Sequence, residues 1–249
     1  VCVCRGGWRR DGVGGGSSGV GGGGGRRLGQ KGGWVGWAAR RGGPLRALAN
    51  DYPDRAWVQA IDVTRDDAPQ ALMALIGQMG GIDLYFHAAG VGWQNAALDA
   101  TKEMRTLLTN GVGFTRMVGE AYRYFAECGG GHIAVISSIA GTKGLGAAPA
   151  YSGTKAFQNV YVQALGQQAH MRHLPIRFTD IRPGFVRTDL LGDGQSYPML
   201  MEPRLVARAI VRAIDRRRHV CVIDWRYRVL TFFWQLIPDA LWRRVSVHT

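Results

Sequence analysis

The sequence predicts an α/β fold in which a doubly wound parallel sheet is flanked by helices on both faces, in three αβα layers. Three observations lead to this prediction. The chain has 249 residues, 46% of them hydrophobic, which suits one domain with a single large core. From residue 34 onward, short apolar runs alternate with longer segments of helical periodicity. No apolar run approaches the ~20 residues that a membrane span requires.

Each predicted strand is a short apolar run, and each predicted helix is a longer amphipathic segment. The predicted strands cover residues 34–38, 57–61, 82–86, 132–136, 176–181 and 220–223. The predicted helices cover residues 68–79, 102–127, 152–173 and 203–217. In the third helix, Ala156, Val160, Ala164 and Leu165 recur at the period of a packed helix face.

The amino-terminal stretch fits this fold poorly. Eighteen of the 37 glycines lie in residues 1–43, and residues 9–13, where a first buried strand belongs, include two arginines and an aspartate. A helix through residues 22–25 would lose about 1 kcal/mol for each glycine relative to alanine. This conflict leads to the hypothesis that residues 1–35 are recorded incorrectly, which a mass spectrum of the amino-terminal peptide would test.

The formal net charge of +13 belongs to the two ends of the chain. Residues 1–46 carry nine basic side chains against one acidic one, and residues 204–249 carry ten arginines against three aspartates. A nucleic-acid-binding protein usually carries a basic face on its folded body. The near-neutral middle of this chain therefore predicts solvated basic ends and no nucleic-acid partner.

The cysteines, at positions 2, 4, 128 and 221, lack the paired spacing of a zinc site. We therefore expect reduced thiols and no bound metal. The first thirty residues contain no apolar segment of the kind found in a signal peptide. These observations predict a cytoplasmic protein.

A glycine-rich loop lies where the first strand should turn into a helix. There, backbone N–H groups can approach a pyrophosphate without obstruction by Cβ atoms. The expected cofactor contacts in this loop are Gly15, Ser17, Ser18, Gly19, Val20 and Gly21. The alternative interpretation of the loop is a low-complexity linker.

Two arginines follow the strand predicted at residues 34–38. A dinucleotide site places an acidic residue at this position for the ribose hydroxyls, or an arginine for a 2′-phosphate. This chain has Arg40 and Arg41 there. The sequence thus predicts NADP(H) as the preferred cofactor and leaves NAD(H) possible; a solvated arginine pair is the alternative.

Tyr151 and Lys155 stand four residues apart near a helix start, so their side chains lie on one helix face. A nearby ammonium favours the phenolate and is expected to lower the pKa of Tyr151, which would make it a general acid/base near neutral pH. Ser138 follows the strand at residues 132–136, at the edge where open α/β sheets bind ligands. Its hydroxyl can hold a carbonyl oxygen. Taken alone, the Tyr–Lys pair could equally be a helix surface pair.

Several motifs occur in a fixed order along the chain. They are Gly-x-x-x-Gly-x-Gly at residues 15–21, Asp62-Val63, Ala88-Ala89-Gly90, Asn110 with Gly113, Ser138, Tyr151 with Lys155, and Pro183-Gly184 with Val186 and Thr188. In this order and spacing, from residue 12 to about residue 224, the chain resembles the short-chain dehydrogenase/reductase family. The resemblance implies a Rossmann-type fold with seven parallel strands. It also implies hydride transfer between NADP(H) and a carbonyl or secondary alcohol.

The resemblance implies a role for each matched residue. Tyr151 would be the acid/base, and Ser138 would orient the substrate carbonyl. Lys155 would bind the nicotinamide ribose and tune Tyr151, while Asn110 would hold the water that relays protons to Lys155. The implied cofactor contacts are Asp62 and Val63 at the adenine, Ala88, Ala89 and Gly90 beneath the cofactor, and Pro183, Gly184, Val186 and Thr188 at the nicotinamide. His87 replaces an asparagine of the family pattern, and we interpret it as a packed structural residue.

Residues 225–249 form an aromatic and arginine-rich extension, broken at Pro238. The favoured interpretation is a helix packed on its own domain or on a second subunit, and contact with an anionic membrane surface is the less favoured one. The resemblance also implies a homodimer or homotetramer formed through the helices at residues 102–127 and 152–173.

The expected substrate is a small carbonyl or alcohol, and the apolar content of residues 190–201 favours a hydrophobic one. Two other functions compete with this prediction. One is the same chemistry with NAD(H). The other is a non-catalytic, basic surface-binding protein that keeps the fold, because a fold does not establish a function.

Overall fold

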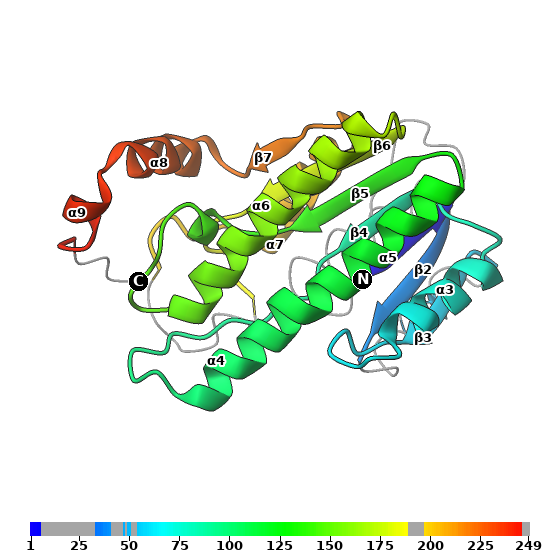
Figure 1. The fold of residues 1–249 in the computed structure, drawn as a ribbon, viewed down its shortest axis with the longest axis horizontal. Helices are drawn as coiled ribbons and strands as arrows, with labels where there is room; N and C mark the ends of the chain where they lie inside the picture. Colours follow the sequence, from blue (N-terminus) through cyan, green and yellow to red (C-terminus); the bar gives the residue numbers. More distant parts are fainter. Residues whose placement is uncertain (6–32, 41–46, 48, 51–53, 189–196, 246–249) are drawn as a thin grey trace.

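The computed structural model describes residues 1–5, 33–40, 47, 49–50, 54–188 and 197–245. Within these ranges the strands form one sheet in the order β3-β2-β1-β4-β5-β6-β7 (Figure 1). The strands are β1 (Cys2–Arg5), β2 (Trp34–Ala39), β3 (Ala56–Ala60), β4 (Leu84–His87), β5 (Gly131–Ile136), β6 (Ile176–Arg182) and β7 (Val220–Val222). Each of the six predicted strands is present, with ends that lie within two residues of the prediction.

The first strand differs from the prediction. The resemblance implied seven parallel strands, but β1 lies in the middle of the sheet and pairs antiparallel with both β2 and β4. The other neighbouring pairs are parallel. Cys2, Val3 and Cys4 are all buried there, and an apolar run of this kind suits a strand covered on both faces. Residues 9–13 lie outside the described residues.

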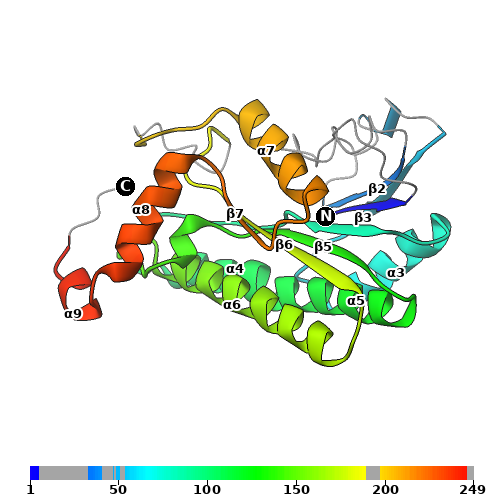
Figure 2. The same ribbon diagram turned by 90° about the horizontal axis from the view of Figure 1, so that it is seen from above.

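The helices confirm the three-layer prediction (Figure 2). They are α3 (Ala68–Gln78), α4 (Ala100–Leu107), α5 (Phe114–Glu127), α6 (Pro149–Met171), α7 (Pro203–Asp215), α8 (Trp225–Leu236) and α9 (Asp239–Trp242). Figure 2 shows α3, α4, α5 and α6 on one face of the sheet and α7 on the other. Helices therefore cover both faces of the sheet.

The side chains of the strands alternate between two cores, as the pleat of a sheet requires. In β4, Tyr85 points into the core shared with α3, α5 and α6, whereas Leu84 and Phe86 point into the core shared with α7. Ile133 and Ala134 of β5 divide in the same way. All five side chains are at most 1% exposed, so the central strands are held rigidly from both faces.

The helix predicted at residues 102–127 is interrupted. A π-helical turn, η1 (Leu108–Gly113), separates α4 from α5. Single π-helical turns inside α-helices are rare and frequently mark functional sites. This one carries Asn110, which is completely buried.

The packed face predicted for α6 is only partly present. Val160 is 64% exposed, and Ala164 is exposed as well. The buried side chains of this helix include Lys155 and Gln158. Leu165 packs against the core, so the predicted apolar face is covered only in part. The buried face of the same helix carries polar groups.

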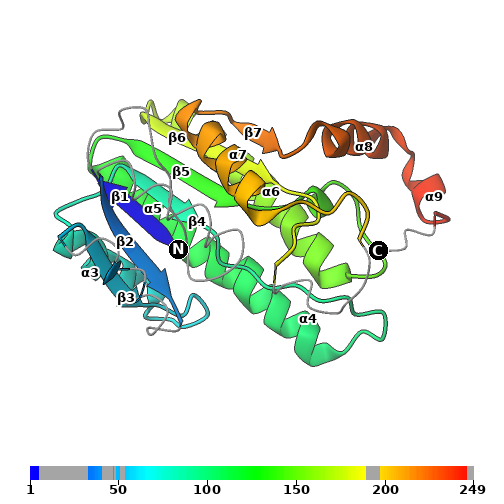
Figure 3. The same cartoon turned by 180° about the vertical axis from the view of Figure 1, so that it is seen from behind.

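The carboxyl-terminal segment extends beyond the edge strand β7 (Figures 1 and 3). Helix α8 packs on its own domain through Tyr227 and Thr231, and the chain breaks at Pro238, as predicted. One face of α8 stays exposed and carries Trp225, Val229, Phe232, Phe233 and Leu236. Among the described residues, no helix combines the length and the hydropathy needed to cross a membrane.

Candidate active site

Four parallel strands deliver predicted site residues to one edge of the sheet. Asp62 follows β3, Ala88 follows β4, Ser138 follows β5 and Pro183 follows β6. Carboxyl ends of parallel strands meet at the same edge, which is where open α/β sheets bind ligands. Helix α6 begins beside this edge and contributes Tyr151 and Lys155.

Tyr151 and Ser138 lie within hydrogen-bonding reach of each other. Ser138 Oγ accepts a hydrogen bond from the Ala140 N–H at 3.1 Å and donates to the Pro183 carbonyl at 3.4 Å. These contacts fix the serine hydroxyl between the ends of β5 and β6. Two hydroxyl groups, one from the end of a strand and one from the start of a helix, therefore meet at the site.

Gly92, which the sequence analysis missed, packs against the ring of Tyr151. A Cβ atom at this glycine would lie 2.4 Å from Tyr151 Cδ2, which is closer than real Cβ contacts come. The loop after β4 can thus pass over the tyrosine ring only because residue 92 has no side chain. A glycine after Gly90 was visible in the sequence, but no local pattern links it to a tyrosine 59 positions away.

Lys155 is a buried cation, with 4% of its surface exposed. Its Nζ donates hydrogen bonds to the Ile136 carbonyl at 3.1 Å and to Gln158 Oε1 at 2.9 Å. Burial lowers the pKa of Lys155 to about 8, although the Asp180 carboxylate acts in the opposite direction. Near neutral pH the side chain is largely charged, and two of its three N–H groups are engaged.

The prediction that the pKa of Tyr151 is lowered is wrong for this structure. The lysine Nζ lies 5.7 Å from the centroid of the tyrosine ring, but its hydrogen bonds go to Ile136 and Gln158. Burial raises the pKa of Tyr151, because the phenolate is poorly solvated, and the contact with Ser138 only partly offsets this. The hydroxyl is therefore protonated at neutral pH.

Asn110 joins three segments of the site. Its Oδ1 accepts a hydrogen bond from the Val91 N–H at 2.9 Å, and its Nδ2 donates to the Val91 carbonyl at 2.7 Å. The same Nδ2 lies 3.2 Å from Thr154 Oγ1, on the turn of α6 between Tyr151 and Lys155. The π-helical turn thereby clamps the loop after β4 to the helix that carries the tyrosine and the lysine.

Asp180 is a buried carboxylate of β6 that the sequence analysis also missed. It accepts hydrogen bonds from Ser137 Oγ and from Arg182 Nε, the latter at 2.7 Å. Both partners stabilise the charged carboxylate. Asp180 supplies negative charge near Lys155. The available signal was an acidic side chain on a strand whose other side chains are apolar, polar or basic.

Asp62 and Arg40 form the far end of the site, beside β2 and β3. Asp62 Oδ1 accepts hydrogen bonds from the N–H of Thr64 at 3.0 Å and from its hydroxyl at 2.7 Å. Burial raises the pKa of Asp62, but these bonds and the charges of Arg40 and Arg65 outweigh it, so the pKa lies below its usual value. Val63, the next residue, is buried.

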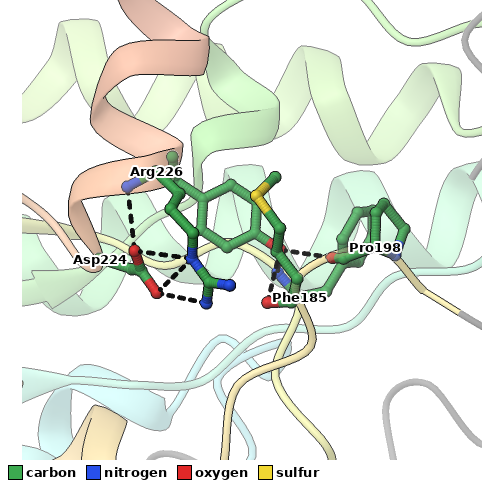
Figure 4. Close-up of polar contacts among 6 residues, drawn as sticks. Phe185, Pro198, Asp224 and Arg226 are labelled. Atoms are coloured by element: carbon green, nitrogen blue, oxygen red, sulfur yellow. Dashed lines mark hydrogen bonds and ion pairs between the residues drawn. The ribbon is translucent and has the colours of Figure 1, made fainter.

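The segment after β6 is held in place by Tyr227 of α8. The tyrosine hydroxyl accepts a hydrogen bond from the Phe185 N–H at 3.2 Å and donates to the Pro198 carbonyl at 2.9 Å (Figure 4). A Cβ atom on Gly184 would lie 2.3 Å from the same ring. Figure 4 also shows Asp224 and Arg226, whose ion pair stands at the start of α8.

Val186 is buried and forms an isolated bridge with Met201, and Thr188 is partly buried. The glycine-rich loop with Gly15, Ser17, Ser18, Gly19, Val20 and Gly21 lies outside the described residues, as does Arg41.

His87 is buried, with Nδ1 2.8 Å from the Tyr85 hydroxyl. Burial lowers its pKa well below the usual value. A neutral, packed histidine agrees with the structural interpretation.

The donor set along this edge fits a dinucleotide. At one end lie the buried ammonium of Lys155, which has one uncommitted N–H, and the hydroxyl groups of Tyr151 and Ser138. These groups suit the hydroxyls of a ribose and a polar substituent on the nicotinamide ring. At the other end an arginine and a carboxylate, Arg40 and Asp62, stand together and suit an adenosine half with or without a 2′-phosphate. Between them the exposed Gly90 presents bare backbone.

Comparison with known proteins gives the same answer as the geometry. A family model described as short chain dehydrogenase matches residues 12–196. An uncharacterised oxidoreductase of Myxococcus xanthus (strain DK1622) is 32% identical over 237 residues, which is 92% of each chain. An uncharacterised oxidoreductase of Mycobacterium tuberculosis (strain CDC 1551 / Oshkosh) is 30% identical over 245 residues, covering 93% of this chain and 95% of the relative.

Solved structures show the same fold. A short-chain dehydrogenase from Sphingobium yanoikuyae in complex with NADPH superposes with a TM-score of 0.76 at 23% identity, covering 92% of this chain and 96% of that one. A 3-ketoacyl-(acyl-carrier-protein) reductase from Brucella melitensis complexed with NADH gives 0.72 at 23% identity, covering 84% and 93%. With a family model over most of its length and relatives that match it almost from end to end, this chain belongs to the short-chain dehydrogenase family of NAD(P)-dependent oxidoreductases.

Proposed function

We propose that this enzyme transfers a hydride between NADP(H) and a carbonyl or secondary alcohol, with Tyr151 as the general acid/base. The observation that carries the proposal is the meeting of three groups at one edge of the sheet. These are the hydroxyl of Tyr151, the hydroxyl of Ser138 and the buried ammonium of Lys155.

In the direction of reduction, Ser138 donates a hydrogen bond to the substrate carbonyl oxygen and holds it beside Tyr151. The bound nicotinamide cofactor supplies the hydride that adds to the carbonyl carbon. Tyr151 gives its hydroxyl proton to the carbonyl oxygen, which becomes the alcohol, and the tyrosine is left as a phenolate. Oxidation runs through the same proton transfer in reverse.

Lys155 has two functions in this proposal. Its remaining N–H binds a ribose hydroxyl of the cofactor, and its positive charge stabilises the phenolate when that forms. Asn110 keeps the loop after β4 against α6, so that the backbone at Ala88, Ala89 and Gly90 lies under the cofactor. On the other side of the site, Pro183, Gly184, Val186 and Thr188 contact the nicotinamide end, and Asp62 and Val63 contact the adenine.

We also propose a preference for NADP(H) over NAD(H). Arg40 is exposed at the end of β2, and its charge acts on Asp62 at the end of β3. An arginine at this position can pair with a 2′-phosphate. Similar structures carry NADPH in one case and NADH in the other, so the choice depends on this chain's own residues.

Replacement of Tyr151 by phenylalanine tests the chemistry. Removal of the hydroxyl takes away the proton donor, so we expect turnover to fall at least about a hundredfold, the usual contribution of a positioned acid/base. Binding of NADPH, followed by its fluorescence, should change less than twofold. Tyr161→Phe is the matched control, because Tyr161 lies on the same helix and stacks on Phe157 at 5.5 Å.

An unchanged turnover in Tyr151→Phe would contradict the proposal and favour the non-catalytic, surface-binding alternative. A screen of ketones and aldehydes, in which NADPH consumption is followed by absorbance, provides the substrate for this test. The apolar residues after Thr188 favour a hydrophobic carbonyl compound as the first choice. The predicted cytoplasmic location stays a prediction.

For the assembly, we propose a homodimer or homotetramer built through α5 and α6 with the adjoining α4. Phe157 and Val160 of α6 are 42% and 64% exposed. Beside them, on α4 and the π-helical turn, the exposed apolar side chains are Met104, Leu107, Leu108 and Val112. An apolar surface of this kind over two packed helices suits a second copy of the same chain.

A further inference from the structure

Gln158 links Lys155 to the main chain of Asn110. Its Oε1 accepts a hydrogen bond from Lys155 Nζ at 2.9 Å, and its Nε2 donates to the Asn110 carbonyl at 2.9 Å. The side chain is completely buried. It stands three residues after Lys155 on α6, so both side chains lie on the same face of the helix.

The chemistry of the two partners fixes the orientation of this carboxamide. An ammonium has only donors and a main-chain carbonyl has only acceptor sites. The oxygen of Gln158 must therefore face Lys155, and its nitrogen must face Asn110. Both anchors are themselves held, since Asn110 is clamped to Val91 and Thr154, and the main chain of α6 fixes the other end.

The resemblance described above implies a water between Asn110 and Lys155 that relays protons. In this structure the carboxamide of Gln158 joins Lys155 Nζ to the Asn110 carbonyl. We propose that Gln158 is a positioning residue that takes the place of this water, fixes the Lys155 ammonium and stabilises its charged form. This proposal rests on the proposed function in one respect: it assumes that Lys155 binds the cofactor and stabilises the phenolate.

The replacement of a water by a carboxamide has a chemical consequence. A water can accept one proton while it releases another, but a neutral amide bound at both ends holds its protons. Lys155 therefore cannot exchange its proton toward Asn110 by this path, and its acid–base equilibrium depends on the strength of the bond to Gln158 Oε1. The other titratable groups that act on Lys155 are Tyr151 on α6, Asp180 on β6 and His87 on β4.

Two variants change this bond in opposite senses. Gln158→Met keeps the length of the side chain and removes the acceptor, so the charged form of Lys155 loses stabilisation and its pKa falls. Gln158→Glu places a carboxylate against the ammonium, so the pKa rises. We expect each shift to be about one pH unit, the lower end of the range for a close charge partner. Gln163→Glu, exposed on the same helix, is the matched control.

The primary measurement is an NMR titration of Lys155 in the cofactor-free protein, with ¹³C-labelled lysine and Lys155→Met for assignment. The expected midpoint is near 8 in the unmodified chain, lower in Gln158→Met, higher in Gln158→Glu and unchanged in Gln163→Glu. The pH profile of kcat/KM should move in the same directions. The Kd for NADPH should stay within about threefold, because Gln158 is completely buried and its carboxamide is bonded to Lys155 and Asn110.

A Lys155 midpoint that is the same in folded Gln158→Met as in the unmodified chain would overturn the proposal. Circular dichroism identifies a variant that does not fold, and Gln158→Asn, whose amide is one methylene shorter, then replaces Gln158→Met. An unchanged Lys155 midpoint in Gln158→Asn would also overturn the proposal. Shifted midpoints in a chain that consumes no NADPH with any substrate would keep Gln158 as a positioning residue and refute the proposed function instead.

Discussion

At the scale of single residues, the proposed preference for NADP(H) depends on a charge at the end of β2. Arg40 is exposed there and its charge acts on Asp62, which lies at the end of the neighbouring strand β3. NADPH and NADH differ at this corner by one phosphate. A side chain that recognises the phosphate therefore changes the affinity for NADPH and leaves the affinity for NADH almost the same.

Replacement of Arg40 and Arg41 by alanine should weaken NADPH binding about tenfold to a hundredfold, which corresponds to the loss of a charge-assisted hydrogen bond. NADH binding should change less than about twofold. Fluorescence titration of both cofactors measures the difference. Arg123→Ala is the control, since Arg123 is an exposed arginine that pairs with Glu120 on α5. An equal loss for both cofactors would contradict the assignment of these arginines.

The residues that could be predicted from the sequence are those whose function depends on local spacing. Tyr151 and Lys155 are one helical turn apart, and Ser138 directly follows an apolar strand. Gln158 and Gly92 depend on distant partners: Gln158 reaches a carbonyl 48 positions earlier, and Gly92 meets a ring 59 positions later. No local pattern contains such information.

At the scale of elements, α8 is tied to the site rather than being an independent tail. Tyr227 binds both Phe185 and Pro198, on the two chain segments that flank residues 189–196. Its ring also covers Gly184. The position of the segment after β6 therefore depends on one side chain of α8.

Removal of the Tyr227 hydroxyl in Tyr227→Phe leaves the Phe185 N–H and the Pro198 carbonyl without this partner. We expect a loss of about 1–3 kcal/mol in the free energy of unfolding and a severalfold rise in KM for the substrate. Thermal unfolding and steady-state kinetics measure the two effects.

Tyr124→Phe separates these two effects. The Tyr124 hydroxyl also accepts a backbone N–H at 3.2 Å, from Ile82, but far from the catalytic edge. It should lose similar stability without a change in KM. If both variants raise KM equally, α8 does not position the site.

The boundaries of the elements were predictable wherever the burial pattern is simple. The strands and α3 agree with their apolar runs, because two-sided or one-sided burial leaves a regular period. The π-helical turn could not be predicted, since its extra residue is stabilised by the bonds of Asn110 to Val91 and Thr154. The face of α6 was misjudged because its buried side is polar.

At the scale of the whole molecule, the proposed assembly depends on the exposed apolar surface over α4 and α6. The α/β architecture was predictable from the alternation of strands and helices. The antiparallel direction of β1 was not, because Cys2–Arg5 is too short for its apolar pattern to encode a direction. Helices α4 and α6 lie side by side on one face of the sheet (Figure 2).

Val160→Glu places a charge in the middle of this surface. Because Val160 is 64% exposed in the single chain, the free energy of unfolding of a monomer should change by less than about 0.5 kcal/mol. The mass from size-exclusion chromatography with light scattering should fall to the 27.2 kDa of one chain. Leu205→Glu on α7, where Leu205 is 61% exposed on the opposite face, should keep the larger mass. A monomeric unmodified chain would refute the proposed assembly.

Gly92 sets a limit on how this enzyme can be re-engineered. A library that aims to change substrate scope would vary the loops around Tyr151, which include the loop after β4. At position 92 even alanine would push a Cβ atom into the Tyr151 ring, so the proposed acid/base would be displaced whichever substrate is chosen. A library that keeps residue 92 as glycine and varies its neighbours should retain far more active clones than a library that also varies residue 92.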